Sequence, residues 1–144
     1  ASSEAAKLLA NKENAADLVG GVSYSGDDLL TITLLDMSLS ATMEASRNVA
    51  EHVLDRLYQV GELHKDNVQH AGFAVLKAPD IPGMLVETAY ISNVDEEVKL
   101  GTPNFQEQLA TAILSGVKEY FYRRPPVGSR VAQLANSFGG NESN

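Results

Sequence analysis

The sequence of 144 residues contains no cysteine and few basic side chains. Without cysteine it has no disulfide framework, no thiolate metal ligand and no cysteine nucleophile. Lysine and arginine number 11 against 19 acidic residues, which gives a net charge of -8. Because nucleic acids and anionic membrane surfaces are bound by clustered lysine and arginine, this balance argues against both as partners.

Long apolar runs and common catalytic signatures are also missing. No stretch approaches the roughly 20 apolar residues of a membrane span. The chain has no GxGxxG, GxxxxGK[ST] or GxSxG motif, so nucleotide-binding and serine-hydrolase functions have no starting point. The first residues, ASSEAAKLLA, lack the basic-then-apolar order of a signal peptide. The sequence is therefore compatible with a cytoplasmic protein or with a chain that begins after its targeting segment.

The three histidines, His52, His64 and His70, do not form a metal-binding pattern. No pair has the HxxxH spacing of a helical zinc site, and no Glu-x-x-His occurs. We interpret each as a surface histidine and not as a metal ligand.

Helical patterns dominate the first 60 residues. A first helix is predicted from a cap at Ser2 or Ser3 to a stop at Gly20, with Glu13 at the margin of its apolar stripe. A carboxylate in that position ordinarily reaches water. A second helix is predicted over about 28–60. Its second half is amphipathic, but its first half is apolar on all sides, which is typical of a core helix or of one with a second partner. The alternation at 31–33 leaves a strand possible there.

The rest of the chain mixes short apolar segments with helices. Residues 72–76 and 84–88 are predicted as buried strands. Asn93 and Glu96 form a capping box for a short helix, and Pro103 opens a last helix. After residue 122 the periodicity ends, so 123–144 is interpreted as a flexible tail or linker. The predicted fold class is α/β, helix-rich with about two to three strands of a mixed or parallel sheet, too few to cover its helices.

Glu87 is the most informative single residue. It follows the apolar residues 84–86, and sites in open α/β sheets gather at the carboxyl ends of strands. A partly desolvated carboxylate there suits proton transfer near neutral pH. A glutamate that ends a strand and points into solvent is the alternative, and the residues alone do not decide between them.

Three stretches together resemble one family. They are ASSEAAKLLANKENAADLVGGV, HAGFAVLKAPDIPGMLVETAYISN and TPNFQEQLATAILSGVKEYF. They are similar to the cell-division N-acetylmuramoyl-L-alanine amidases, periplasmic zinc hydrolases of the amidase-3 type. The resemblance covers 1–122 and identifies this range as the C-terminal half of a catalytic domain, with a regulatory helical insertion over about 1–45.

The resemblance implies an activity and a cofactor. The family cleaves the amide between N-acetylmuramic acid and the L-alanine of the peptidoglycan stem peptide. Its zinc ion is held by two histidines and a glutamate, all expected upstream of Ala1, so residues 1–144 alone are expected to be inactive. Glu87, in the VET motif, is similar to the family's general acid/base.

The resemblance also implies regulation. The insertion would block the active site, with Glu13 reaching the zinc ion; Glu4 is the other candidate. The neighbouring segment DDLLTITLLDMSLS resembles a helix that docks on a LytM-domain activator, through Leu30, Leu34 and Met37. Two alternatives stay open: an interaction module without catalysis, and a helical scaffold in which Glu87 is structural.

Overall fold

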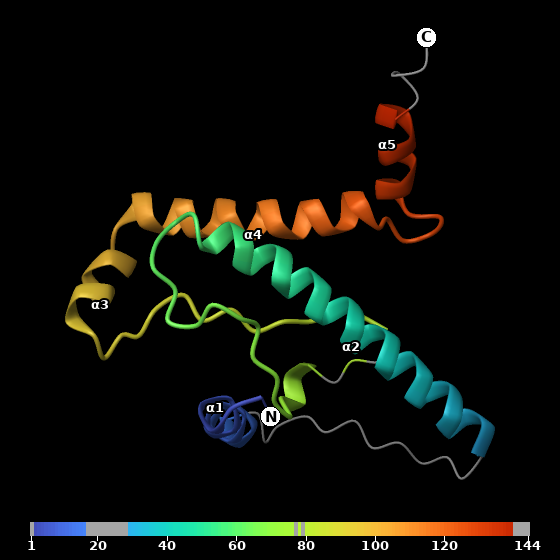
Figure 1. The fold of residues 1–144 in the computed structure, drawn as a ribbon, viewed down its shortest axis with the longest axis horizontal. Coiled ribbons are helices and arrows are strands. Elements are labelled where there is room, and N and C mark those ends of the chain that lie inside the picture. The colour runs from blue at the N-terminus through green and yellow to red at the C-terminus, as the bar shows by residue number, and fades with distance from the viewer. Residues whose placement is uncertain (1, 17–28, 77, 79, 140–144) are drawn as a thin grey trace. The chain divides into compact units, whose positions relative to one another are not determined.

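The structure is a computed structural model that describes residues 2–16, 29–76, 78 and 80–139, with the backbone alone for 15–16, 29–32, 35 and 136–139. Along the chain (Figure 1), the elements are α1 (Glu4–Ala16), α2 (Leu29–Leu57), the 3-10 helix η1 (Ala74–Leu76), α3 (Val94–Leu100), α4 (Pro103–Arg123) and α5 (Arg130–Gly139). The helices predicted after Asn93 and from Pro103 are confirmed, and so are the predicted first and second helices over Glu4–Ala16 and Leu29–Leu57. The predicted stop at Gly20 and the predicted start near residue 28 lie outside the described residues.

The predicted α/β class is wrong for the described residues, among which there is no strand. The first predicted strand, 72–76, contains η1, and the second, 84–88, has no regular structure. A strand exists only when its backbone hydrogen bonds pair with a neighbouring strand. In the part of the chain that the structure describes, no neighbour pairs with these segments, and Phe73 is their one buried residue, so the predicted burial is also wrong.

The segment after α4 also differs from its prediction. Arg130–Gly139 forms α5, where the sequence predicted a tail without regular structure. Gly128 adopts a φ of 77°, a left-handed conformation that favours glycine, and the chain turns there. The Ser129 hydroxyl then accepts the Ala132 amide at 3.1 Å and caps the new helix. The predicted division of the chain at residue 122 stays a prediction.

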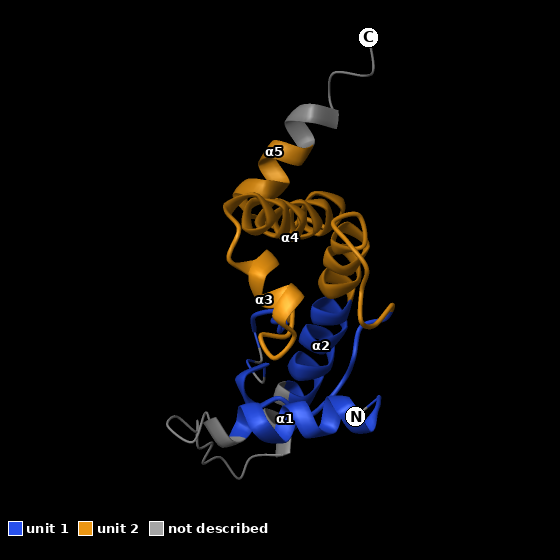
Figure 2. Ribbon diagram, turned by 90° about the vertical axis from the view of Figure 1, so that its left-hand side faces the viewer, with its two compact units in different colours: residues 1–47, 67–86 blue, residues 48–66, 87–144 orange. Residues whose placement is uncertain are grey.

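The described chain divides into two compact units, coloured separately in Figure 2. One comprises 1–47 and 67–86, and the other comprises 48–66 and 87–144. The boundary falls inside α2, so the first half of this helix belongs to the first unit and the second half to the second unit. Each unit is considered by itself.

In the first unit, α1 is joined to the segment before and within η1. The Ser3 hydroxyl caps α1 by accepting the Ala6 amide at 3.1 Å, as the sequence predicted. Asn14 donates its side-chain amide to the Gly72 carbonyl at 2.8 Å and accepts the Ala74 amide at 2.7 Å. These bonds satisfy backbone groups that lack a partner strand. Ala6 and Ala10 of α1 are buried.

In the second unit, α2 and α4 cross at very short range. A side-chain carbon at Gly116 would lie 2.5 Å from the Val53 Cα and 2.8 Å from the His52 carbonyl oxygen. Only glycine permits this approach, and it brings the buried Val53 into the crossing, where it is 2% exposed. The core of this unit is completed by buried side chains of α4: Leu109, Ala112 and Tyr120.

The capping box before α3 is confirmed. The Asn93 side-chain oxygen accepts the amides of Asp95 at 3.1 Å and Glu96 at 3.4 Å. Glu96 returns the contact, because its carboxylate accepts the Asn93 side-chain amide at 2.8 Å. Two residues with the right spacing thus fix the start of this helix.

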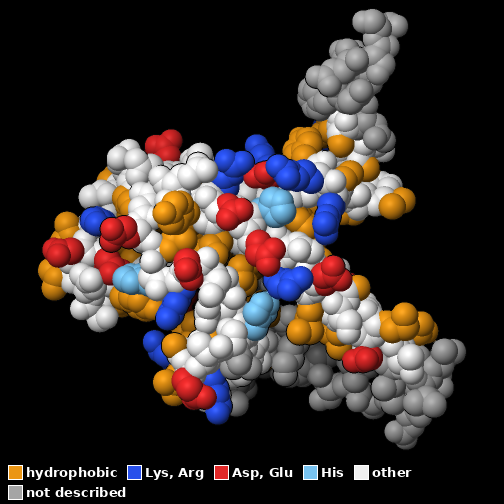
Figure 3. Space-filling view, in the orientation of Figure 1, with side chains coloured by type: hydrophobic (Ala, Val, Ile, Leu, Met, Phe, Trp, Pro, Cys, Tyr) orange, Lys and Arg blue, Asp and Glu red, His pale blue; other side chains and the backbone are white. Residues whose placement is uncertain are grey.

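The surface carries charged side chains of both signs, as the composition implies (Figure 3). On the face drawn in Figure 3, acidic and basic side chains are interspersed between apolar ones. A search of the helices in the described ranges finds none with the length and apolar character of a membrane span.

Candidate functional site

Glu87 lies in the second unit, on the irregular segment that precedes α3. It borders a small cavity of about 60 Å³. The residues lining this cavity come from the end of α2, the loop after it, the Glu87 segment and α4: Leu57, Val60, Gly61, Glu62, Leu63, Glu87, Thr88, Phe105 and Leu109. Glu87 itself is exposed, so the partly desolvated position predicted from the sequence is not found.

The cavity combines carboxylates with an apolar wall. Glu62 and Glu87 both line it, and the buried Leu109 and half-buried Phe105 supply apolar surface. Its volume has room for a few water molecules. A carboxylate beside a water-sized space is placed to accept a hydrogen bond from a water molecule, which is the geometry that a general base requires. The sequence analysis did not predict Glu62 as a site residue, because Glu62 and Glu87 are far apart in the sequence and only the fold brings them to one cavity.

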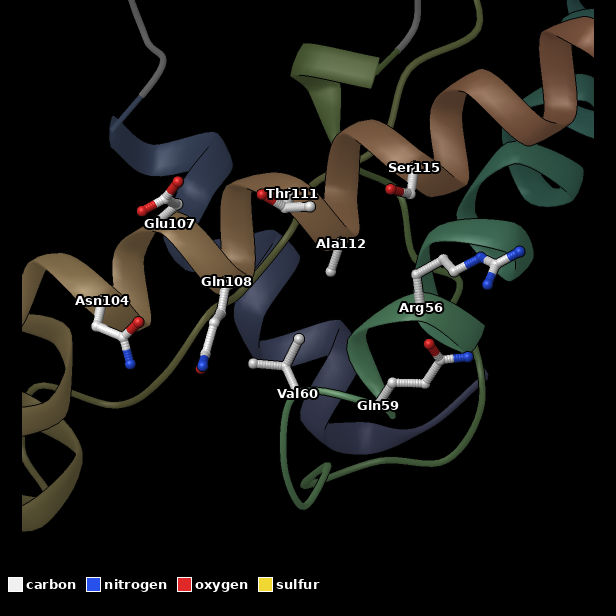
Figure 4. A pocket seen from close by; sticks show the side chains of 9 residues that line it. All are labelled: Arg56, Gln59, Val60, Asn104, Glu107, Gln108, Thr111, Ala112 and Ser115. Atoms are coloured by element: carbon white, nitrogen blue, oxygen red, sulfur yellow. The ribbon is translucent and has the colours of Figure 1, made fainter.

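A larger cavity of about 430 Å³ lies elsewhere in the second unit, between the end of α2 and α4 (Figure 4). Its lining is mainly polar and includes Arg56, Gln59, Asn104, Gln108 and Thr111. It contains no histidine and none of the site residues predicted from the sequence. We place the candidate site at the smaller cavity. Its lining includes Glu87, the predicted acid/base, and the type of lining residue is a better guide to function than the volume of a cavity.

Arg56 at the larger cavity is engaged in an ion pair. Its guanidinium donates to one Glu119 oxygen at 3.1 and 2.6 Å, and Arg123 contacts the other at 2.7 Å. The hydrogen bond from Arg56 is the main cause of a lowered pKa of Glu119, with the positive charges of Arg56 and Arg123 adding to it. This carboxylate is therefore a structural anion and a poor proton acceptor near neutral pH.

The predicted zinc-contacting residue, Glu13, lies in the first unit, in the last turn of α1, and is half-buried. Its position at the margin of the apolar side agrees with the sequence interpretation. It directly precedes Asn14, whose side chain ties α1 to the η1 segment. The alternative residue, Glu4, is exposed in the first turn.

Two of the three predicted activator-binding residues are exposed on α2. Leu34 is 58% exposed and Met37 is 65% exposed. For these two positions the interpretation as a core helix is wrong. The side chain of Leu30 lies outside what the structure describes, although its backbone is helical. At helical spacing, these three positions lie along one side of α2.

The histidines occupy three different environments. His52 is half-buried, with its Nδ1 atom 2.8 Å from the Asn48 carbonyl oxygen and its ring edge-on to Tyr120. His64 is exposed and contacts Glu96 and Tyr90. His70 is exposed, and its backbone bonds to Ser2. Within the described ranges, no group of three or more histidine, aspartate or glutamate side chains is placed to hold a metal ion. These residues do not fit a complete zinc site, so no step below is routed through zinc.

Comparison with known proteins gives a family. Residues 10–119 match the family described as N-acetylmuramoyl-L-alanine amidase. The chain belongs to this family. The match covers the second half of α1, all of α2, the Glu87 segment and most of α4, and it agrees with the resemblance of the three sequence stretches.

Three relatives match most of this chain but less than half of their own length. N-acetylmuramoyl-L-alanine amidase AmiC of Escherichia coli O6:H1 is 54% identical over 121 residues, which are 84% of this chain and 29% of the relative. AmiC of Neisseria meningitidis serogroup B is 48% identical, over 83% of this chain and 29% of its own length. AmiA of Escherichia coli K12 is 42% identical, over 85% of this chain and 43% of its own length. The chain spans less than half the length of these relatives.

Proposed function

We propose that this chain forms part of a peptidoglycan amidase that cleaves the amide between N-acetylmuramic acid and L-alanine. The family membership carries the proposal, because it covers most of the chain. The position of Glu87 at a water-sized cavity supports it chemically. The complete amidase chain, meaning residues 1–144 within a polypeptide of its relatives' full length, is the object of the tests below.

In this proposal Glu87 is the general acid/base. Its carboxylate takes a proton from the attacking water as the water oxygen bonds to the amide carbon. It then gives that proton to the nitrogen of L-alanine as the carbon–nitrogen bond breaks. Because Glu87 is exposed, this role requires that substrate or the rest of the domain closes over it and excludes bulk water.

The cofactor belongs to the proposal and rests on the resemblance. Zinc in such enzymes activates water and polarises the scissile carbonyl. Residues outside the described ranges would hold the ion, and Glu87 is not proposed as one of its ligands.

The test of the central role is Glu87→Gln in the complete amidase chain. Removal of a general base lowers kcat by about 10²- to 10⁴-fold. Release of soluble fragments from purified peptidoglycan measures turnover, and elemental analysis measures zinc. We expect the loss of turnover at unchanged zinc content. Full activity of the variant at normal zinc occupancy refutes the assignment.

We further propose that α1 blocks the active site, with Glu13 as the residue that reaches the zinc ion. The half-buried position of Glu13 in the last turn of α1 supports it over the exposed Glu4. Glu13→Ala should raise basal activity of the complete chain, and Glu4→Ala should leave it unchanged. Equal basal activity of the Glu13→Ala variant and the unchanged protein counts against the block.

The block would be released by a LytM-domain activator that binds the Leu30, Leu34 and Met37 side of α2. The exposure of Leu34 and Met37 supports this, because apolar side chains at helical spacing fit a hydrophobic groove. Titration of a LytM domain against the protein and against its Leu34→Asp variant tests it. We expect weaker binding of the variant, and equal affinities would exclude this surface.

We propose that the protein acts in the periplasm, in cell separation during division; the resemblance to the cell-division amidases supports this. A second candidate function is an interaction module that binds the activator without catalysis. The same exposed side of α2 favours it. The Glu87→Gln comparison separates the two, because only the enzyme loses turnover.

A further inference from the structure

Glu96 connects three different segments of the second unit. Its carboxylate accepts the backbone amide of Tyr90 at 2.7 Å and the side-chain amide of Asn93 at 2.8 Å. The Nε2 atom of His64, which is 32 residues earlier, lies 3.1 Å from each Glu96 oxygen. The sequence predicted only the contact with Asn93. The contact with His64 joins the loop after α2 to the start of α3.

A ring contact reinforces the same junction. The His64 and Tyr90 rings have centroids 4.8 Å apart, with planes inclined by 53°. Glu96 therefore holds Tyr90 by its backbone, while His64 holds it by its ring. The hydrogen bond from the Tyr90 amide, followed by the one from His64, lowers the pKa of Glu96, so this carboxylate remains an acceptor near neutral pH.

The junction adjoins the candidate site along both chain segments. Leu63 lines the Glu87 cavity and is followed directly by His64. Glu87 and Thr88 line the same cavity and are followed two residues later by Tyr90. The cavity lining and the His64 contacts are independent observations. Together they show that the loop after α2 runs beside the segment that carries Glu87.

We propose that His64 is a positioning residue for Glu87, acting through Glu96 and Tyr90. The proposal rests on the function proposed above. Glu87 stands on a segment without regular structure, so no strand pairing or helix fixes its backbone. His64 contacts the ring of Tyr90, three residues beyond Glu87, and also contacts Glu96, which accepts the Tyr90 backbone amide. Both contacts therefore fasten the segment at Tyr90. A catalytic group that is displaced by about 1 Å loses roughly 100-fold in rate, so such a fastening bears directly on turnover.

The test compares two substitutions of similar size in the complete amidase chain. His64→Leu removes the donor to Glu96, whereas His64→Gln keeps an N–H donor at the end of a side chain of similar length. We expect His64→Leu to lower kcat by about 10-fold or more with KM within about 2-fold, because alignment and not affinity is lost. His64→Gln should recover most of the loss. His70→Leu is the matched control, because the bonds of His70 to Ser2 run through its backbone, and it should leave kcat unchanged.

A double-mutant cycle with Glu87→Gln separates this proposal from the proposed function. If His64 acts through Glu87, His64→Leu should cost less than about 2-fold in single-turnover rate once Glu87 is glutamine, because the two losses are not additive. If the losses multiply, or if His64→Leu keeps the full kcat while Glu87→Gln is inactive, the positioning role is refuted alone. If Glu87→Gln keeps full activity, the proposed function fails first. Should His64→Leu fail to fold, His64→Ala replaces it with the same expectations.

Discussion

The two halves of α2 show how one helix can carry two kinds of apolar surface. In the second half, Val49 and Val53 are buried, and α4 crosses the helix at Gly116. In the first half, Leu34 and Met37 are more than half exposed. Apolar side chains on a helix are stable either in a core or as a surface reserved for a partner. The second half therefore belongs to the core of its unit, and the exposed first half is the surface that the proposed activator would bind.

A charge placed in each half of α2 tests most strongly whether the two halves differ in burial. Val53→Asp should destabilise the protein by about 3–5 kcal/mol, because it leaves an unpaired charge in a buried position. Leu34→Asp should change stability by no more than about 0.5 kcal/mol, because its side chain is already in water. Urea unfolding of the complete chain measures both values. Similar losses for the two variants would mean that the first half is also part of a core.

A second substitution asks what holds the second half in place. Gly116→Ala should destabilise by about 1–3 kcal/mol, because the added methyl group forces α4 away from the Val53 backbone. The steric effect opposes the higher helix propensity of alanine, which by itself would stabilise by about 1 kcal/mol.

Gly61→Ala is the matched control in the same unit, because an added carbon there meets nothing within 4 Å. We expect it to leave the urea midpoint nearly unchanged. A Gly116→Ala protein as stable as the Gly61→Ala protein would show that the two helices do not approach as closely as described.

The smallest expected effect concerns acid stability. Arg56 lowers the pKa of Glu119 in the folded state below its ordinary value of 4.5. The unfolded state therefore binds the proton more readily, and the stability contributed by this pair is present above pH 4.5 and is lost as pH falls through the lower folded-state value. The thermal midpoint of the unchanged protein should fall between pH 5 and pH 3, partly because this pair is lost. In the Arg56→Met variant that fall should be smaller. Identical pH profiles for the two proteins would contradict a role for the pair.

Local signals in the sequence predicted what local interactions determine. The Asn93–Glu96 spacing gave the start of α3, and Ser3 gave the cap of α1, because each contact joins residues at most three apart. The strand at 84–88 failed for the opposite reason, since a strand depends on a partner elsewhere in the chain. The prediction that Glu87 is partly buried was wrong for the same reason, because it assumed the strand.

Long-range contacts at the site were beyond sequence reasoning. The sequence selected Glu87 as the candidate catalytic residue, but it did not predict that Glu62 lies at the same cavity or that His64 contacts Glu96. His64 was interpreted as a surface histidine, and its exposure agrees. Its contacts with Tyr90 on the Glu87 segment and with Glu96 in α3 depend on how the loop after α2 folds back, which no spacing in the sequence encodes.

The most direct test of the central claim compares the two carboxylates that share one cavity. Glu87→Gln and Glu62→Gln remove the same charge from the same place in the complete amidase chain. With purified peptidoglycan, the account predicts a loss of kcat of about 10²-fold or more for Glu87→Gln at normal zinc content, and less than about 10-fold for Glu62→Gln. Equal turnover of the Glu87→Gln enzyme and the unchanged enzyme would contradict the account.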